Sequence, residues 1–538
     1  MKTRILELVL ELNKDIIKLI QKSLSSVPYL NFIYTFSNRS IMNFKRVLLG
    51  MLSIFLCYAV HAQKKSNIII FMVDDMGWQD TSYPFGPNTT TFNKRYHTPN
   101  MERLAKSGVA FTDAYSTPVC TPTRVSLMTG MNASKHHVTN WTAPMKDNPT
   151  GNKDEEMEEP DWNYNGMSPI AGVEHTIYAT PLAQILKDHG YFTIHAGKAH
   201  WGSAGTAGSN PYSLGFTVNI AGTSTGRPAS YWGEQNFGRT STDYHGIENL
   251  QEYFGQEINL TEALTQEALK SLEFPIQHKL PFFLHLSHYA LHDPLMEDRR
   301  YFQKYLDQGL SRNEAKYASM IESMDKSLGD VLDFLESKNI QDNTYIIFIS
   351  DNGGLSTIPP RDGVAHTHNK PLRSGKGSIY EGGIRVPLMI KGIKNNVKNK
   401  RNDVPVIVED IFPTVLDMAQ IKKVKTVQEI DGISQLSALK NLGTVRQERP
   451  LVFHIPNKWT KSDGDGFNYR SAIRKGKYKL VWSLRNDSFE LFDLEEDLGE
   501  QNNLIEKEGM QVIAEGLKSE LQTILKNNKA PMPKRKGN

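Results

Sequence analysis

Short apolar runs, each long enough for one strand, alternate with amphipathic segments along most of this chain. The runs occupy residues 67–73, 191–196, 281–286, 345–350 and 386–390. Between them, residues 182–190 and 313–337 place apolar side chains at the spacing of a helix face. Strands that alternate with helices predict an α/β fold, in which helices cover both faces of a buried sheet.

Polar residues follow four of these runs at the point where each strand would end. The pairs are Asp74 and Asp75, Lys198 and His200, His288 and His292, and Asp351 and Asn352. In open α/β sheets, ligands bind at the carboxyl ends of the strands. We therefore expect these side chains to converge on one site at one edge of the sheet.

The chain changes character after about residue 447. Short strands joined by charged turns are expected at residues 469–473, 478–482 and 489–492. A final helix is expected at residues 509–526. We therefore predict a main domain at residues 63–446 and a C-terminal subdomain at residues 447–538, which holds a small antiparallel sheet and one helix.

The first 62 residues are expected to be absent from the mature protein. Met42 is followed by two basic residues, an apolar run at residues 47–60 and small residues that end at Ala62. This is the pattern of a secretory signal peptide with Met42 as the true start, and the run is too short to span a bilayer comfortably. We predict an exported protein, periplasmic or secreted, with no stable membrane span. Residues 1–41 receive no function.

The charge of the chain excludes one large class of partner. Residues 1–62 hold 8 of the 62 Lys and Arg residues and 3 of the 59 Asp and Glu residues, so the remainder carries 54 basic and 56 acidic side chains. A net charge of −2 gives no bulk attraction to nucleic acid, and we expect none as a partner. The acidic segment 146–162 is typical of a surface loop.

Cys120 is the only cysteine expected in the mature chain, because Cys57 lies in the predicted signal peptide. A lone thiol forms no intramolecular disulfide, and a zinc cage needs several soft ligands. Cys120 is therefore either a buried bystander or a reactive group. Pro122 could open a helix, which would place Cys120 at the helix amino end, where free N–H groups attract anions. Arg124 would add a guanidinium fork for an oxyanion.

Charged and oxygen-bearing side chains complete the predicted site. Two lysines in glycine-flanked turns would add positive charge, Lys198 and Lys376. Four residues at two strand ends offer oxygen ligands, namely Asp74, Asp75, Asp351 and Asn352. An all-oxygen set suits Ca²⁺ or Mg²⁺ rather than zinc or copper. Calcium tolerates irregular, carboxylate-rich geometry better than magnesium does, so we expect calcium.

Five motifs occur in the order that is found in one enzyme family. Residues 120–124, Cys-Thr-Pro-Thr-Arg, match the Cys-x-Pro-x-Arg signature of the formylglycine-dependent sulfatases. The other sequence blocks of that family are similar to residues 73–77, 197–202, 350–354 and 375–383. The resemblance spans roughly residues 66–500. It implies an alkaline-phosphatase-like fold, with a large mixed sheet flanked by helices and a smaller C-terminal antiparallel sheet plus helix.

The resemblance also implies a reaction. A formylglycine-generating or sulfatase-maturating enzyme would oxidise Cys120 to formylglycine, or 3-oxoalanine. One oxygen of its hydrate would bind calcium and attack the sulfur of a sulfate ester. The implied metal ligands are Asp74, Asp75, Asp351 and Asn352 together with the oxidised Cys120. The implied groups that stabilise the transferring charge are Arg124, Lys198 and Lys376.

Histidines would move the protons of that reaction. His292 matches the family position that contacts the sulfate and the leaving oxygen, where a sugar alkoxide requires a general acid. His200 would help the second hydroxyl of the hydrate to collapse, which expels sulfate and restores the aldehyde. Ala199 and Leu291 depart from residues that are common in the family. The choice between His288 and His292 as the general acid therefore stays open.

The prediction of the substrate class rests on weaker sequence signals. Export and chain size favour a sulfated carbohydrate, as expected for a bacterial polysaccharide sulfatase. Five residues could face a sugar, namely His137, Trp141, Trp201, Arg227 and Arg373. Relatives that use the same aldehyde hydrolyse phosphodiesters or phosphonates, so that activity is one alternative. A non-catalytic glycan-binding protein is the other, although a pure binder has no need of Cys120.

Overall fold

The computed structural model describes residues 65–239, 244–356, 369–393, 399–440, 449–461 and 463–537. The predicted signal peptide, with Met42 and Cys57, lies outside the described residues. Within the described residues, no helix is both long enough and apolar enough to cross a membrane.

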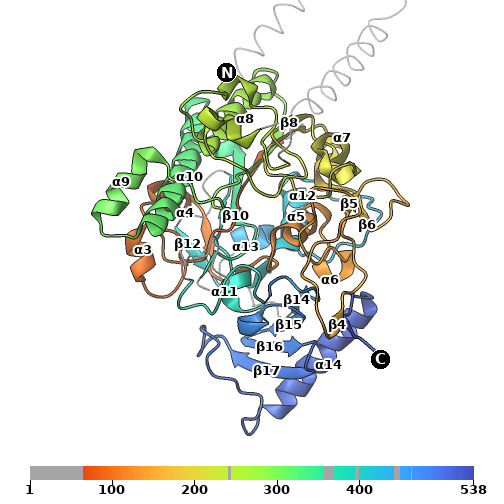
Figure 1. Cartoon of the computed structure of the whole chain (residues 1–538). Helices are drawn as coiled ribbons and strands as arrows, with labels where there is room; N and C mark the ends of the chain where they lie inside the picture. The colour runs from red at the N-terminus through yellow and green to blue at the C-terminus, as the bar shows by residue number, and fades with distance from the viewer. Residues whose placement is uncertain are drawn as a thin grey trace, which may run out of the picture. The chain divides into compact units, whose positions relative to one another are not determined.

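A mixed eight-stranded sheet organises the larger part of the fold (Figure 1). Its strands, in spatial order, are β12 (Lys400–Asn402), β2 (Val109–Phe111), β11 (Leu388–Lys391), β10 (Thr344–Ser350), β1 (Asn67–Val73), β9 (Phe282–Ser287), β7 (Phe192–Gly197) and β8 (Val218–Ile220). The central strands β10, β1, β9 and β7 are parallel, whereas β11 is antiparallel to both β10 and β2. All five apolar runs are strands of this sheet.

The strands of the large sheet are buried on both sides because helices cover both of its faces. In β1, Ile68, Ile70 and Met72 belong to one apolar core, and the alternate residues belong to the other. The first core includes side chains of α5 (Cys120–Thr129), α7 (Leu182–Asp188) and α12 (Ile411–Met418). The second includes side chains of α4 (Pro99–Ser107), α8 (Leu260–Gln277) and α10 (Arg312–Ser337). The predicted α/β class is confirmed.

The C-terminal region forms the smaller antiparallel sheet that the sequence predicts. Its strands are β14 (Leu451–Ile455), β15 (Arg470–Lys475), β16 (Tyr478–Ser483) and β17 (Ser488–Asp493). Helix α14 (Gln511–Asn527) lies against this sheet, as the blue segment of Figure 1 shows, and its leucines form an apolar cluster with the strands. Strand β14 was not predicted. The proposed domain boundary near residue 447 lies outside the described residues and stays a prediction.

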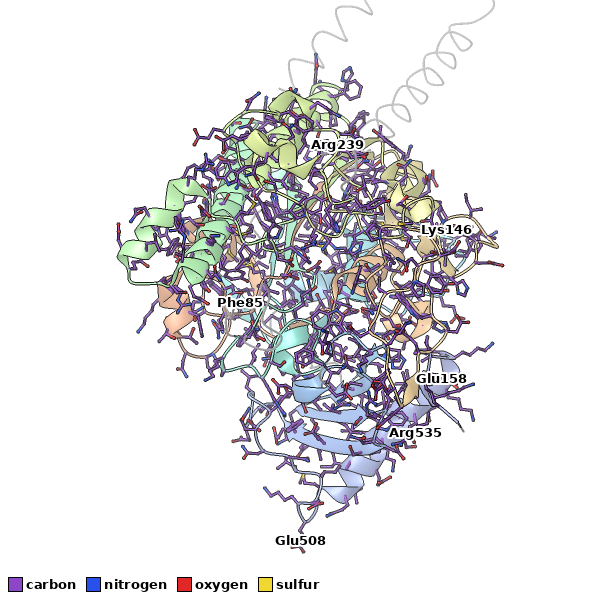
Figure 2. All side chains as sticks on the ribbon, viewed as in Figure 1. Phe85, Lys146, Glu158, Arg239, Glu508 and Arg535 are labelled. Atoms are coloured by element: carbon purple, nitrogen blue, oxygen red, sulfur yellow. The ribbon has the colours of Figure 1, made fainter. Side chains whose placement is uncertain are left out.

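The acidic segment 146–162 lies largely at the surface, as expected, but it also contains a short strand and a buried carboxylate. Within it, β4 (Met157–Glu158) pairs with β18 (Lys534–Arg535), and Figure 2 shows Glu158 beside Arg535. Asp154 is buried between Lys458 and Arg485. The segment is therefore attached to the C-terminal region by charge pairs as well as by backbone hydrogen bonds.

Short elements complete the described fold. They are α3 (Thr91–Arg95), β3 (Ala114–Tyr115), α6 (Ala133–His136), β5 (Gly166–Ser168), β6 (Thr176–Tyr178), α9 (Arg299–Asp307), α11 (Glu381–Ile384), β13 (Val406–Ile407) and α13 (Leu436–Lys440).

Candidate active site

The carboxyl ends of four parallel strands meet at one edge of the large sheet. Val73 of β1 pairs with Ser350 of β10, and Ser287 of β9 pairs with Gly197 of β7. Gly197 has a φ of 97°, and a Cβ there would lie 1.9 Å from the Ser287 carbonyl oxygen. Only glycine therefore lets β7 end this close to β9. The polar residues that follow these strands are brought together as expected, except for His288, which packs between the sheet and α10.

Three buried carboxylates form the acidic part of the site. One oxygen from each of Asp74, Asp75 and Asp351 lies within 4.8 Å of the others. Asn352 Nδ2 donates a hydrogen bond of 2.8 Å to Asp75 Oδ1. Burial and the neighbouring Asp351 raise the pKa of Asp74 well above its ordinary value, although Lys198 opposes this rise. The carboxylates therefore cost free energy unless more positive charge lies near them.

The donor set fits a hard cation. Two buried oxygens, Asp74 Oδ1 and Asn352 Oδ1, have no hydrogen-bond partner among the described residues. Buried oxygens of this kind are satisfied in proteins by a donor, a water or a metal ion. Carboxylate and amide oxygens are ligands that Ca²⁺ prefers. Asp74, Asp75, Asp351 and Asn352 therefore suit the calcium ion that the sequence motifs imply.

Two buried lysines lie against the same carboxylates. Lys198 Nζ is 2.5 Å from Asp74 Oδ2, and Lys376 Nζ is 2.5 Å from Asp75 Oδ1. Both lysine side chains are almost completely buried. Their charge offsets part of the negative charge of the cluster, and Lys376 also lines the pocket described below.

Arg124 is directed at the protein rather than at the pocket. Its Nε and Nη2 donate to Asp351 Oδ2 at 3.0 and 2.7 Å. Its Nη1 donates to the Lys198 carbonyl oxygen at 2.8 Å and to Ser287 Oγ at 2.7 Å. The side chain is fully buried. These contacts indicate that Arg124 positions Asp351 and the strand ends, and its role as a fork for an oxyanion stays a prediction.

Cys120 is the first residue of α5 and lies beside both the acidic and the basic groups. Its sulfur lies within 4.8 Å of ligand atoms of Asp74 and His292. Burial raises the pKa of the thiol, but Lys198 and Lys376, aided by hydrogen bonds from two histidines, lower it well below its ordinary value. A thiol in such surroundings at a helix amino end is a reactive group rather than a bystander.

The two histidines near Cys120 have opposite protonation preferences. Burial and Lys376 lower the pKa of His292, but Asp75, Asp293 and Asp74 outweigh them and raise it to about 9. Burial lowers the pKa of His200. The structure therefore favours a protonated His292 and a neutral His200 at neutral pH, the pattern expected of an acid and a base in one site.

His288 lies apart from this chemistry. Its Nε2 is 2.8 Å from Ser327 Oγ of α10, and its ring packs 5.0 Å from that of Phe71. Burial lowers its pKa to about 3. His288 is a packed, neutral histidine, whereas His292 faces the pocket. Of the two candidates for the general acid, the geometry favours His292.

A pocket of about 620 Å³ opens over Cys120. The predicted residues that line it are Cys120, His200, His292 and Lys376. Asp74, Asp75, Asp351 and Asn352 are fully buried next to it. Cys120, the oxygen atoms that could hold a cation, and the two histidines are thus adjacent to a space large enough for a small organic group.

Comparisons with known proteins agree with this geometry. The profile of the sulfatase family matches residues 66–421, and that of the N-sulphoglucosamine sulphohydrolase C-terminal region matches residues 375–527. The chain belongs to the sulfatase family. It is therefore a sulfuric ester hydrolase of the alkaline-phosphatase-like superfamily.

Individual sulfatases match along most of the chain. A sulfatase of Formosa agariphila is 30% identical over 526 residues, which cover 87% of this chain and 90% of that protein. The N-acetylgalactosamine-6-sulfatase of Mus musculus is 26% identical over 451 residues, 82% of this chain and 76% of that protein. The solved structure of Ps i-CgsB in complex with k-i-k-neocarrahexaose has a TM-score of 0.66 at 25% identity, and the match covers 86% of this chain and 93% of that one.

Two of the five residues that could face a sugar line the pocket of this sulfatase, namely Trp141 and Arg227. The other three do not. His137 Nε2 is 2.8 Å from the Asn528 carbonyl oxygen, and Trp201 is fully buried with its Nε1 donating to the Arg124 carbonyl oxygen. Arg373 stacks on Tyr380 and pairs with Asp465. These three residues thus have structural contacts away from the pocket over Cys120, and a sugar contact for them stays a prediction.

The pocket wall also contains residues that no sequence motif indicates, namely Asn152, His245, Trp459 and Lys461. They come from loops far apart in the chain and belong to no motif. One glycine gives an indirect sequence signal for Trp459. Gly377 has a φ of 87°, and a Cβ there would lie 2.0 Å from the Trp459 ring. Gly377, which follows Lys376, thus makes room for a tryptophan of the C-terminal region.

Proposed function

We propose that this sulfatase is exported and removes sulfate from a sulfated carbohydrate, with a formylglycine made from Cys120 and a bound calcium ion. One observation carries the proposal. Cys120 begins α5 beside the carboxylates, both lysines and both histidines, and it lines an open pocket. A maturating enzyme would convert the thiol to the aldehyde before or during export.

Calcium would be held by Asp74, Asp75, Asp351, Asn352 and the modified residue 120. When bound, it supplies Lewis-acid polarisation of the sulfate group and of the attacking hydroxyl. Lys198 orients Asp74 through its contact of 2.5 Å, and Arg124 orients Asp351. These buried partners fix the direction of the ligand oxygens before substrate arrives.

The side chains that line the pocket would assist transfer of the sulfuryl group. A hydroxyl of the aldehyde hydrate at position 120 would release its proton to water and bond to sulfur, while the bond between sulfur and the ester oxygen breaks. His292 would give its proton to the departing ester oxygen. Lys376, which lines the pocket, would stabilise negative charge on the sulfuryl oxygens.

His200 would assist the release of sulfate. Its Nε2 lies 3.0 Å from the Thr142 carbonyl oxygen, which holds the ring beside Cys120. In its neutral form it can accept the proton of the remaining hydroxyl at position 120. The bond between carbon and the sulfate oxygen then breaks, sulfate leaves and the aldehyde returns. The cycle consumes one water and needs no oxidant or reductant.

A carbohydrate substrate is supported by the pocket wall and by relatives. Trp141 is 38% exposed at the pocket, and an aromatic face of this kind can stack on a sugar ring. Arg227 offers a cation beside His292, where it pairs with Asp293 at 2.8 Å. One relative is named for N-acetylgalactosamine-6-sulfate, and another was solved with a neocarrahexaose.

Release of free sulfate from a panel of sulfated mono-, oligo- and polysaccharides tests this function. Matched phosphate esters and Cys120→Ala are assayed in parallel, and mass spectrometry follows residue 120. We expect the exchange of a sulfur and two hydrogens for one oxygen at residue 120, and sulfate release by the wild-type protein alone. Protein that carries the aldehyde yet prefers phosphate esters, or that binds glycans without turnover, would refute the proposal.

A further inference from the structure

The geometry points to a second binding site next to the catalytic pocket. We infer that it holds the sugars that adjoin the sulfated one, so that the protein acts on a glycan chain rather than on a single sugar. This inference rests on the proposed carbohydrate substrate. The proposed sugar-binding site is a groove of about 560 Å³. Its lining includes Pro144, Asn210, Tyr212, Asn219 and residues 222–225.

The groove and the catalytic pocket share one wall. Pro144 lines both spaces. Residues 222–225 line the groove, and the next two residues, Gly226 and Arg227, line the pocket. A ligand that leaves the pocket over this wall therefore enters the groove directly.

The shared wall is tied to the catalytic histidine. The backbone N–H of His200 donates to the Thr223 carbonyl oxygen at 3.1 Å. A Cβ on Gly226 would lie 2.7 Å from the His200 ring, so only glycine lets the wall pass this close. Pro144, which also lines both spaces, is held by a second backbone contact, in which the Ala204 N–H donates to the Pro144 carbonyl oxygen at 3.1 Å. The groove thus has a fixed position relative to the reacting group.

The groove has the chemistry that sugars need. Hydroxyl and amide side chains supply donors and acceptors, and two tyrosines supply aromatic faces, Tyr212 and Tyr244. These rings are 54% and 64% exposed, which packing within the described chain does not explain. Sugar-binding sites combine apolar ring faces with a few oriented polar groups in this way.

The charge of the groove indicates which part of the substrate it takes. Its basic residue Arg239, labelled in Figure 2, pairs with Glu248 of the same groove at 2.6 Å. The two charges offset each other, so the groove offers no excess positive charge for a second sulfate. We therefore expect it to bind hydroxyl-bearing, uncharged stretches of the glycan, and the catalytic pocket to take the sulfated sugar.

Chain-length dependence tests the inference. The substrates are di-, tetra- and hexasaccharides that carry a single sulfate and are otherwise uncharged, together with a small aryl sulfate that fills only the catalytic pocket. Tyr212→Ala and Tyr244→Ala remove the exposed rings. Tyr178→Ala is the matched control, because Tyr178 is 43% exposed on β6 and lines neither space.

We expect the wild-type kcat/KM to rise with chain length. Tyr212→Ala should lower kcat/KM on the hexasaccharide roughly 5- to 20-fold more than on the aryl sulfate, mainly through KM, whereas Tyr178→Ala should match the wild type. Turnover of carbohydrates without length dependence, or an equal loss on all substrates, would overturn this inference alone. Turnover of the aryl sulfate but of none of the carbohydrates would overturn the proposed substrate class and this inference with it.

Discussion

Arg124 donates two hydrogen bonds to a single oxygen of Asp351, and both side chains are fully buried. The same guanidinium reaches the Lys198 carbonyl oxygen and Ser287 Oγ. One side chain of α5 therefore joins the ends of β7, β9 and β10. Because Asp351 is a candidate calcium ligand, the orientation of that ligand depends on a helix residue four positions after Cys120.

Substitution of Arg124 by lysine should weaken calcium binding. Lysine keeps the charge but loses the planar fork that holds Asp351. Loss of a partner that orients a metal ligand lowers metal affinity by about 10- to 100-fold. Calorimetric titration of the chelated protein with calcium measures this change. Arg103→Lys is the control, because Arg103 is a surface arginine that pairs with Asp333 and Glu336. Equal affinity in Arg124→Lys and the wild type would contradict the positioning role.

Removal of calcium should destabilise the protein as well as inactivate it. Without a cation, the buried Asp74, Asp75 and Asp351 repel one another, and burial and Asp351 already raise the pKa of Asp74. A ligand at 100 times its dissociation constant adds about 2.7 kcal/mol to the free energy of unfolding. Thermal unfolding with chelator, Ca²⁺ or Mg²⁺ should give the highest Tm with Ca²⁺. In Asp351→Asn the increase in Tm caused by Ca²⁺ should be smaller. An identical wild-type Tm in all three buffers would refute the calcium site.

Much of the large sheet could be predicted because of how it is buried. Parallel strands covered on both faces are near-continuous apolar runs, and β1 was predicted at its observed bounds. Short strands such as β2 and β8 hold three residues each, which is too few for a strand pattern to be recognised in the sequence. The edge of the sheet that carries the site was predictable because the strands are parallel and their ends coincide.

The pocket wall could not be predicted, for a different physical reason. Motifs establish that Cys120 and Arg124 lie near each other, but not that the arginine points at Asp351 instead of the pocket. Asn152 and Trp459 reach the pocket from segments about 300 residues apart, and their contact depends on the packing of the C-terminal sheet. Such tertiary arrangements leave no periodic trace in a single sequence.

His292 and His288 should differ sharply in a leaving-group experiment. His292→Ala removes the proposed acid, so sulfate release from a sugar should fall about 10²- to 10⁴-fold. Release from a nitrophenyl sulfate should fall much less, because that leaving oxygen needs no proton. His288→Gln keeps a polar partner for Ser327 and should leave the ratio of the two rates unchanged. An equal loss on both substrates in His292→Ala would assign His292 a structural role.

Glu409 should make the protein less stable as the pH rises. Burial, and then the neighbouring Asp410, raise its pKa to about 8, whereas the ordinary value is 4.5. The folded protein therefore holds a proton that the unfolded chain releases, and stability declines as pH rises from about 4.5 through 8. Glu409→Gln should remove roughly 1–4 kcal/mol of the decline in the free energy of unfolding between pH 5 and 8.

Denaturant titrations at several pH values measure this effect. Glu508→Gln is the control, since Glu508 is exposed. If Glu409→Gln and the wild type lose stability in parallel over this pH range, another group carries the dependence.

Asp154 should link folding of the acidic segment to substrate affinity. Its side chain is buried, pairs with Lys458 at 2.8 Å and with Arg485, and accepts the backbone N–H groups of Glu156 and Met157 at 2.9 Å. Hydrogen bonding from Arg485 holds the pKa of Asp154 below its ordinary value. Its contribution to stability is therefore present above the unfolded pKa, near 3.8, and is lost as pH falls below it.

Asp154→Asn removes the carboxylate that pairs with Lys458, whereas Arg485 keeps Asp463 and Glu156 as partners, so the free energy of unfolding should fall by about 1–3 kcal/mol at neutral pH. Two residues away, Asn152 Nδ2 donates to the Trp459 carbonyl oxygen at 2.8 Å, and both residues line the pocket. Loosening this wall should raise KM for oligosaccharides about 3- to 10-fold, while kcat changes little because no reacting group moves. Glu155→Gln, at an exposed neighbouring position, is the matched control. A fall in kcat with unchanged KM would show that Asp154 acts on the reacting groups rather than on the wall.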